Sequence, residues 1–141
     1  MLFRSHLANP LRALLEQKRI LKPLGVLILT LPYKPATFDH RRPVATLQHL
    51  LDDLAKGTPE SDLGHLEEIL SLHDLQRDRP AGNLQQFRKR SLDNFKNRGL
   101  HQHVFDLRLI QAMLEHFGFG IVALDISGIN MLAVAVRSES P

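Results

Sequence analysis

The stretch "GVLILTLP", from Gly25 to Pro32, constrains the fold of this 141-residue chain more than any other. Val26 to Leu31 is almost uninterruptedly apolar, and a glycine and a proline bound it. A short apolar run between such residues predicts a β-strand that is buried on both faces. Such a strand needs sheet neighbours on both sides, so the rest of the chain has to supply them.

Two more strands are predicted near the C-terminus, at residues 121–126 and 131–136, joined by a Ser-Gly turn as a hairpin. Apolar spacing predicts five helices, at residues 10–21, 46–55, 63–75, 84–98 and 106–117. Asn9, Thr46 and Asp106 stand where helix N-caps belong. We therefore expect one α/β domain over residues 1–137, with a helical insert at residues 33–100 and a frayed tail at residues 138–141.

The composition narrows the class of protein. The sequence contains no cysteine, so a disulfide framework and a thiolate metal site are excluded. The apolar runs are shorter than a membrane span, and no signal peptide pattern is present, so we expect a cytoplasmic protein without membrane contact. The net charge is only +3, with one tyrosine and no tryptophan, so nucleic-acid binding is weakly indicated.

Eight histidines without cysteine raise the question of a metal site. In an extended segment, His101 and His103 would face the same side. A His/carboxylate site could be built from these two with His49, His65, Glu67, Glu68 and Asp39. Their spacing matches no compact ligand motif, so we predict no metal. A polar substrate pocket and plain surface or capping histidines are the remaining interpretations.

Residues 6–32, "HLANPLRALLEQKRILKPLGVLILTLP", carry a family pattern. They resemble the second half of class I S-adenosylmethionine-dependent methyltransferases of the type 11 kind. In that family, His-[Leu/Val]-x-[Asp/Asn]-Pro and a helix precede Arg-[Val/Ile]-Leu-Lys-Pro-Gly-Gly and an apolar strand. The matching residues are His6, Asn9, Pro10, Arg19, Leu21, Lys22, Pro23 and Gly25. Leu24 replaces the first glycine of the pair, at a turn that favours positive φ.

Later segments, at residues 38–53, 64–70, 101–114 and 120–137, are similar to the insert, last helix and last two strands of a bacterial subgroup of these enzymes. The resemblance implies a partial Rossmann-like methyltransferase fold with a three-stranded mixed sheet. It also implies that the strand at residues 26–31 pairs antiparallel with the strand at residues 131–136. The other edge of the first strand should be bare, or covered by something foreign to the family fold.

The resemblance implies S-adenosylmethionine as cofactor, held in this family by a Gly-rich turn and an acidic residue after the next strand. The sequence contains no Gly-x-Gly-x-x-Gly. We therefore expect a truncated or split methyltransferase that is inactive alone and binds the cofactor poorly. A complementing N-terminal half, or a second copy in a homodimer, is the partner that this expectation suggests.

The resemblance also suggests roles for single residues. His103, and after it His101, is the expected catalytic base, because imidazole titrates near neutral pH. His6 is expected near the methyl end of the cofactor. The acceptor is expected to contact Asp39, Arg41, Arg42, His49, His65 and Glu68, with an arginine binding an anionic group.

Two other functions fit the sequence. An exposed apolar edge at residues 26–31 could pair with a second copy or a partner, which would make the chain a non-catalytic interaction module. The histidines could instead serve an independent His-dependent enzyme or a metal protein.

Overall fold

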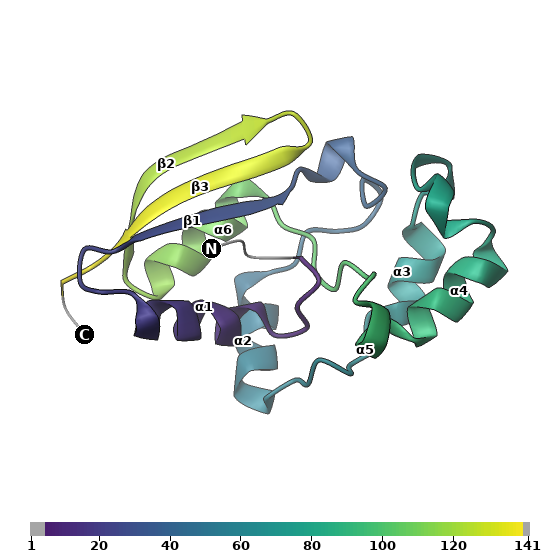
Figure 1. Ribbon diagram of the computed structural model, residues 1–141, viewed down its shortest axis with the longest axis horizontal. Helices are drawn as coiled ribbons and strands as arrows, with labels where there is room; N and C mark the ends of the chain where they lie inside the picture. The colour runs from purple at the N-terminus through teal and green to yellow at the C-terminus, as the bar shows by residue number, and fades with distance from the viewer. Residues whose placement is uncertain (1–4, 140–141) are drawn as a thin grey trace.

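The computed structural model describes residues 5–139 and confirms an α/β fold (Figure 1). The helices are α1 (Pro10–Ile20), α2 (Leu47–Lys56), α3 (Leu66–Leu72), α4 (Leu84–Leu92), α5 (Asn94–Asn97) and α6 (Leu107–His116), and the strands are β1 (Val26–Pro32), β2 (Phe119–Ser127) and β3 (Asn130–Arg137). Short 3₁₀ turns lie at Lys34–Ala36, Leu75–Arg77 and Arg79–Ala81. The sheet lies at one end of the molecule with α1 and α6, and α3, α4 and α5 lie at the other end.

The sheet has the order β1-β3-β2, and both strand pairs are antiparallel. Val26 lies opposite Val136 and Leu31 lies opposite Met131, which confirms the predicted pairing of the first and last strands. The expectation of a mixed sheet is wrong. β1 and β2 run in the same direction, but β3 separates them, so no parallel pair forms. A Rossmann-like ancestry of this sheet stays a prediction.

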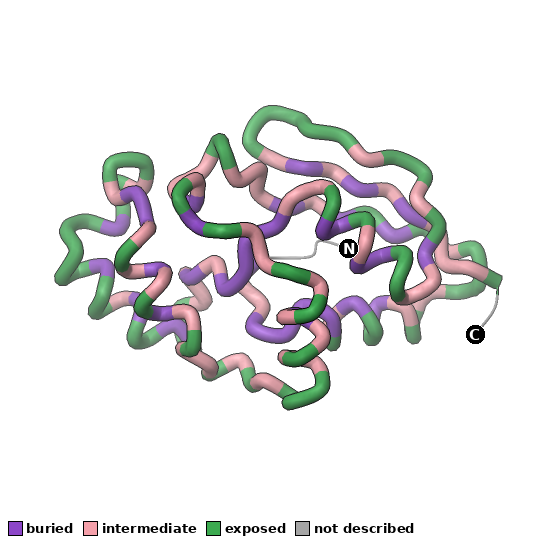
Figure 2. Tube along the Cα trace, turned by 180° about the vertical axis from the view of Figure 1, so that it is seen from behind, coloured by how far each residue is buried: buried purple, intermediate pink, exposed green. Residues whose placement is uncertain are grey.

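The prediction that β1 is buried on both faces is also wrong. Leu27, Leu29 and Leu31 are buried, whereas Val26 and Ile28 are 55% and 45% exposed. The physical reason is that helices cover one face of this antiparallel sheet, so the residues of β1 and β3 alternate between buried and more exposed (Figure 2). Among the residues that the structure describes, the outer face of β1 therefore exposes apolar side chains.

Three helices begin directly after the residues that were predicted as their N-caps. The side chains of Asn9, Thr46 and Asp106 each accept a hydrogen bond from a backbone N–H three residues later. Two predicted helices are shorter than expected. The one at residues 63–75 is helical only as α3, because the Asp62 carboxylate binds the Gly64 N–H before it and Asp74 starts a 3₁₀ turn after it. The one at residues 84–98 is divided into α4 and α5 at Asp93.

Two apolar clusters form the interior. The larger one joins the inner face of the sheet to α1, α2 and α6, with Leu14, Leu29, Leu50 and Met113 fully buried in it. The smaller one lies within the predicted helical insert, around Phe87, and also contains Leu66, Ile69, Ala81 and Leu100. The segment between α5 and α6 connects the two clusters.

Residues 1–4 of the predicted domain and residues 140–141 of the predicted tail lie outside the described residues.

No helix within residues 5–139 is both long enough and apolar enough to cross a membrane.

The turn that leads into β1 has a left-handed backbone at Leu24, a conformation that favours glycine. Leu24 has a φ of 60° and its side chain is 58% exposed. Gly25 follows in close contact with the chain, because a Cβ there would lie 2.7 Å from the Lys22 carbonyl oxygen. A left-handed backbone at a leucine costs free energy that glycine avoids.

We expect Leu24→Gly to stabilise the protein by about 0.5–1 kcal/mol, because relief of the left-handed strain exceeds the entropy that glycine adds to the unfolded chain. Urea denaturation measures the change. Leu24→Ala is the matched control, since it removes the exposed side chain but keeps the Cβ. An equal gain in both variants would contradict a backbone cause.

Candidate functional site

The candidate site is built around residues 100–105, an extended and mostly buried segment between α5 and α6. The Ala45 N–H donates to the Val104 carbonyl oxygen, and the Gln102 N–H donates to the Ser5 carbonyl oxygen. These bonds hold the loop before α2 and the chain before α1 against the segment. Side chains from distant parts of the sequence therefore meet along it.

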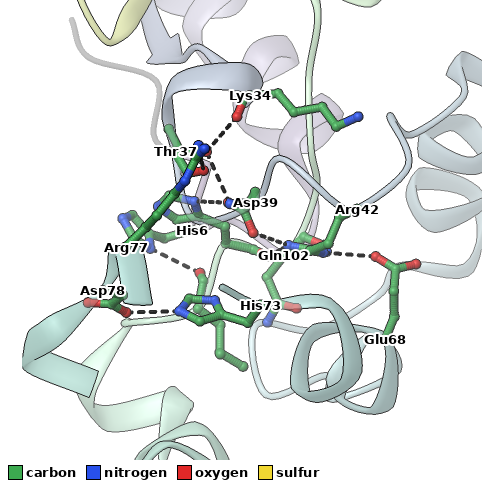
Figure 3. Close-up of polar contacts among 12 residues, drawn as sticks. His6, Lys34, Thr37, Asp39, Arg42, Glu68, His73, Arg77, Asp78 and Gln102 are labelled. Carbon is green, nitrogen blue, oxygen red and sulfur yellow. Dashed lines mark hydrogen bonds and ion pairs between the residues drawn. The ribbon is translucent and has the colours of Figure 1, made fainter. Parts of the chain in front are cut away.

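Arg42 is the most enclosed charged residue of the site, with a side chain 1% exposed. Its guanidinium donates to Glu68 Oε1 at 2.9 Å, to Asp39 Oδ1 at 3.1 Å, and to the carbonyl oxygens of His101 and Gln102 at 2.7 and 3.2 Å (Figure 3). These contacts join the loop before α2, α3 and the 100–105 segment. Arg42 therefore acts as an internal clamp rather than as a free cation for an acceptor.

Asp39 and His101 form a second buried contact. His101 Nδ1 lies 2.5 Å from Asp39 Oδ2, and the His6 ring packs edge-on against His101 with 4.7 Å between ring centroids. Burial alone would raise the pKa of Asp39. The hydrogen bond and charge of His101, together with Arg42, outweigh burial and hold this pKa below its ordinary value. The structure thus brings together three predicted site residues as one polar group.

This pKa has a consequence for acid unfolding. The Asp39 carboxylate stabilises the fold fully above its unfolded pKa of 3.8, and the contribution is lost as pH falls through the lowered folded pKa. We expect Asp39→Asn to be less stable than the wild type near neutral pH and the difference to narrow below about pH 4. Urea titrations across this range measure it, and a difference independent of pH would contradict the shift.

A second group, the histidine cluster, consists of His49 and Asp53 on α2, His65 just before α3, and His103. One ligand atom from each of the four side chains lies within 4.8 Å of the other three. His49 Nε2 is 3.1 Å from His65 Nε2 and 3.3 Å from Asp53 Oδ2, and His103 Nε2 is 3.6 Å from the same oxygen. The imidazoles of His49 and His103 therefore lie beside one carboxylate oxygen, and His65 lies next to His49.

His103 is the deepest member of the cluster. Burial lowers the pKa of His103 to about 4 and also lowers that of His65, so both imidazoles are neutral at pH 7. His103 Nε2 lies 3.0 Å from the Ala8 carbonyl oxygen, whereas Nδ1 is buried and has no hydrogen-bond partner within residues 5–139. A pKa this low makes His103 a weak general base near neutral pH.

A pocket of about 300 Å³ opens beside the cluster, and we call it the histidine pocket. Its lining includes the three histidines of the cluster with Arg42, Glu68 and Gln102. Gln102 Oε1 is also buried without a hydrogen-bond partner among the described residues. The polar side chains of the lining suit a polar ligand or ion.

The structure distributes the predicted site residues over both groups. His49, His65, His103 and Glu68 line the histidine pocket. His101, Asp39 and His6 form the neighbouring polar group, so His101 and His103 have different partners. The Arg41 side chain is 53% exposed and contacts Asp74 instead.

Asp53 was missed by the sequence analysis, which considered His49 without the residue one helical turn later. The available signal was the spacing of four residues within a predicted helix, because side chains at i and i+4 share a face.

No protein-family model, no curated protein and no solved structure matches this chain.

Proposed function

We propose that the histidine pocket binds a small polar molecule, and that this molecule is the acceptor in a methyl-transfer reaction. The observation that carries the proposal is the pocket itself, because it is lined by Arg42 and by four other side chains that the family resemblance assigned to acceptor binding or catalysis. These are His49, His65, Glu68 and His103. Its volume of about 300 Å³ suits a small ligand.

The methyl-transfer part of the proposal is supported by the type 11 methyltransferase resemblance of residues 6–32. Two structural features agree with that resemblance. The first strand pairs antiparallel with the last, and Leu24 has the positive φ of the glycine it replaces. A sulfonium methyl donor is already activated, so the pocket mainly has to align the acceptor with it. The imidazoles that line the pocket can do so by hydrogen bonding.

The test compares the present chain with a longer chain that includes the residues encoded directly upstream. We expect calorimetry to detect no binding of S-adenosylmethionine by the present chain. We expect the longer chain to contain a Gly-rich turn, to bind the cofactor, and to transfer a labelled methyl group to a small molecule from cell extract. His49 lines the pocket and its side chain is 41% exposed, so His49→Gln tests acceptor binding without disturbing a buried core position.

His49→Gln should lower methyl transfer at least tenfold while cofactor binding is unchanged, and the exposed His116→Gln should alter neither. Micromolar binding of S-adenosylmethionine by the present chain would contradict the expectation that cofactor binding needs the longer chain. A longer chain that binds no S-adenosylmethionine would overturn methyl transfer as the reaction.

A second candidate function is association through β1, and the exposed outer face of this strand favours it. β1 is an edge strand of the sheet, and Val26 and Ile28 project apolar side chains outward beside Val136 and Val134. Exposed apolar edges favour strand pairing between chains. Light scattering after size-exclusion chromatography should show a dimer that Ile28→Lys converts to a monomer. A monomer at high concentration would contradict this candidate.

A further inference from the structure

We infer that His49, Asp53, His65 and His103 form a binding site for a divalent transition metal ion, with zinc favoured by the ligand types. Three imidazoles and one carboxylate are a set that zinc accepts, and calcium and magnesium prefer oxygen ligands. The inference goes beyond the proposed function and does not depend on methyl transfer. It also reverses the sequence prediction that no metal binds.

The distances between ligand atoms match a tetrahedral site. Zinc–nitrogen and zinc–oxygen bonds of about 2.0–2.1 Å place two ligands of a tetrahedron about 3.4 Å apart. The separations of His49 Nε2 from His65 Nε2 and from Asp53 Oδ2, 3.1 and 3.3 Å, lie close to that value. Small side-chain movements would therefore suffice to coordinate an ion, and the backbone elements already hold the ligands in place.

The surrounding contacts orient two of the four ligands. Thr58 Oγ1 donates to Asp53 Oδ1 at 2.8 Å, which leaves Oδ2 directed at the histidines. His103 Nε2 lies within hydrogen-bond distance of the Ala8 carbonyl oxygen, and an N–H at Nε2 leaves the unpaired Nδ1 as the ligand nitrogen of His103. These supporting bonds restrict the rotamers of Asp53 and His103 before any ion binds.

The unpaired nitrogen of His103 is an independent sign of a missing partner. A buried imidazole nitrogen without a hydrogen bond costs free energy, and such atoms are rare in folded proteins. His49, in contrast, is 41% exposed at the side chain, so the cluster has one buried side and one side open to the pocket. An ion can therefore enter from the pocket, and an oxygen of a small molecule in the pocket would lie next to it.

The test uses protein purified without a polyhistidine tag. Its metal content is measured by mass spectrometry, and its zinc affinity is measured by competition with a chromophoric chelator. We expect one zinc ion per chain. His65→Ala and His49→Ala should each weaken zinc binding more than 100-fold. Thr58→Val should weaken it about 10- to 100-fold, because it frees the Asp53 carboxylate without removing a ligand.

His116→Ala is the matched control, since it removes an exposed histidine from α6 and should leave the affinity unchanged. Circular dichroism of each variant shows whether it is folded, and Thr58→Val keeps all four ligands if a histidine variant does not fold. Zinc binding below one ion per chain, or equal affinity of the wild type, His65→Ala and Thr58→Val, would overturn the inference. Methyl transfer could fail while zinc still binds, so the two proposals fail separately.

Discussion

Replacing Arg42 by methionine should lower the free energy of unfolding by about 3–5 kcal/mol, the cost of removing one partner from a buried ion pair. The variant would leave the Asp39 carboxylate without one of its two side-chain hydrogen-bond partners, Arg42 and His101. It would also leave the His101 and Gln102 carbonyl oxygens without the guanidinium. Because natural domains are stable by only about 5–15 kcal/mol, part of the variant should be unfolded at 37 °C.

Urea denaturation followed by circular dichroism measures this effect. Arg41→Met is the matched control, because Arg41 is the neighbouring arginine, is half-exposed, and contacts Asp74 at 3.5 Å. It should cost less than about 1 kcal/mol. The double variant Arg42→Met/Asp39→Asn should lose less than the sum of the two single variants, since both changes disrupt the same contact. A loss below about 1 kcal/mol in Arg42→Met would contradict the role of Arg42 as an internal clamp.

Zinc should stabilise the folded protein by about 2.7 kcal/mol when its free concentration is 100 times the dissociation constant. For a domain of this size, the melting temperature should rise on the order of 10 °C. The reason is that the four ligands come from α2, the start of α3 and the 100–105 segment, so the unfolded chain cannot present them together. Thermal melts with zinc and with a chelator measure the difference.

The control for the zinc effect is His65→Ala. The melting temperature of this variant should be the same with zinc as with the chelator. His116→Ala should show the full wild-type shift. An equal shift in the wild type and His65→Ala would mean that zinc binds elsewhere on the protein.

The local features of the fold were predictable because short-range chemistry fixes them. Asn9, Thr46 and Asp106 cap helices for the reason that the sequence suggests, a side-chain oxygen beside unpaired N–H groups. The burial of β1 was not predictable in the same way. Its residues are apolar on both sides, and the residue types alone do not show that helices cover only one side.

The sequence was enough to identify several residues of the candidate site, but it was not enough to predict which of them lie together. His49, His65 and His103 were identified as polar residues of a pocket, but their meeting depends on the packing of three separate elements. Arg42 shows the same limit. Next to Arg41 in a proline-containing loop it suggests a free cation, whereas its burial comes from contacts with residues about 60 positions later.

The most direct test of the metal site is X-ray absorption at the zinc edge of the untagged protein with one equivalent of zinc. We predict four-coordinate zinc with nitrogen and oxygen ligands at about 2.0–2.1 Å and scattering from three imidazoles. The His65→Ala variant should lose one imidazole from this pattern. A spectrum of hydrated zinc without imidazole scattering would contradict the assignment of His49, Asp53, His65 and His103 as a metal site.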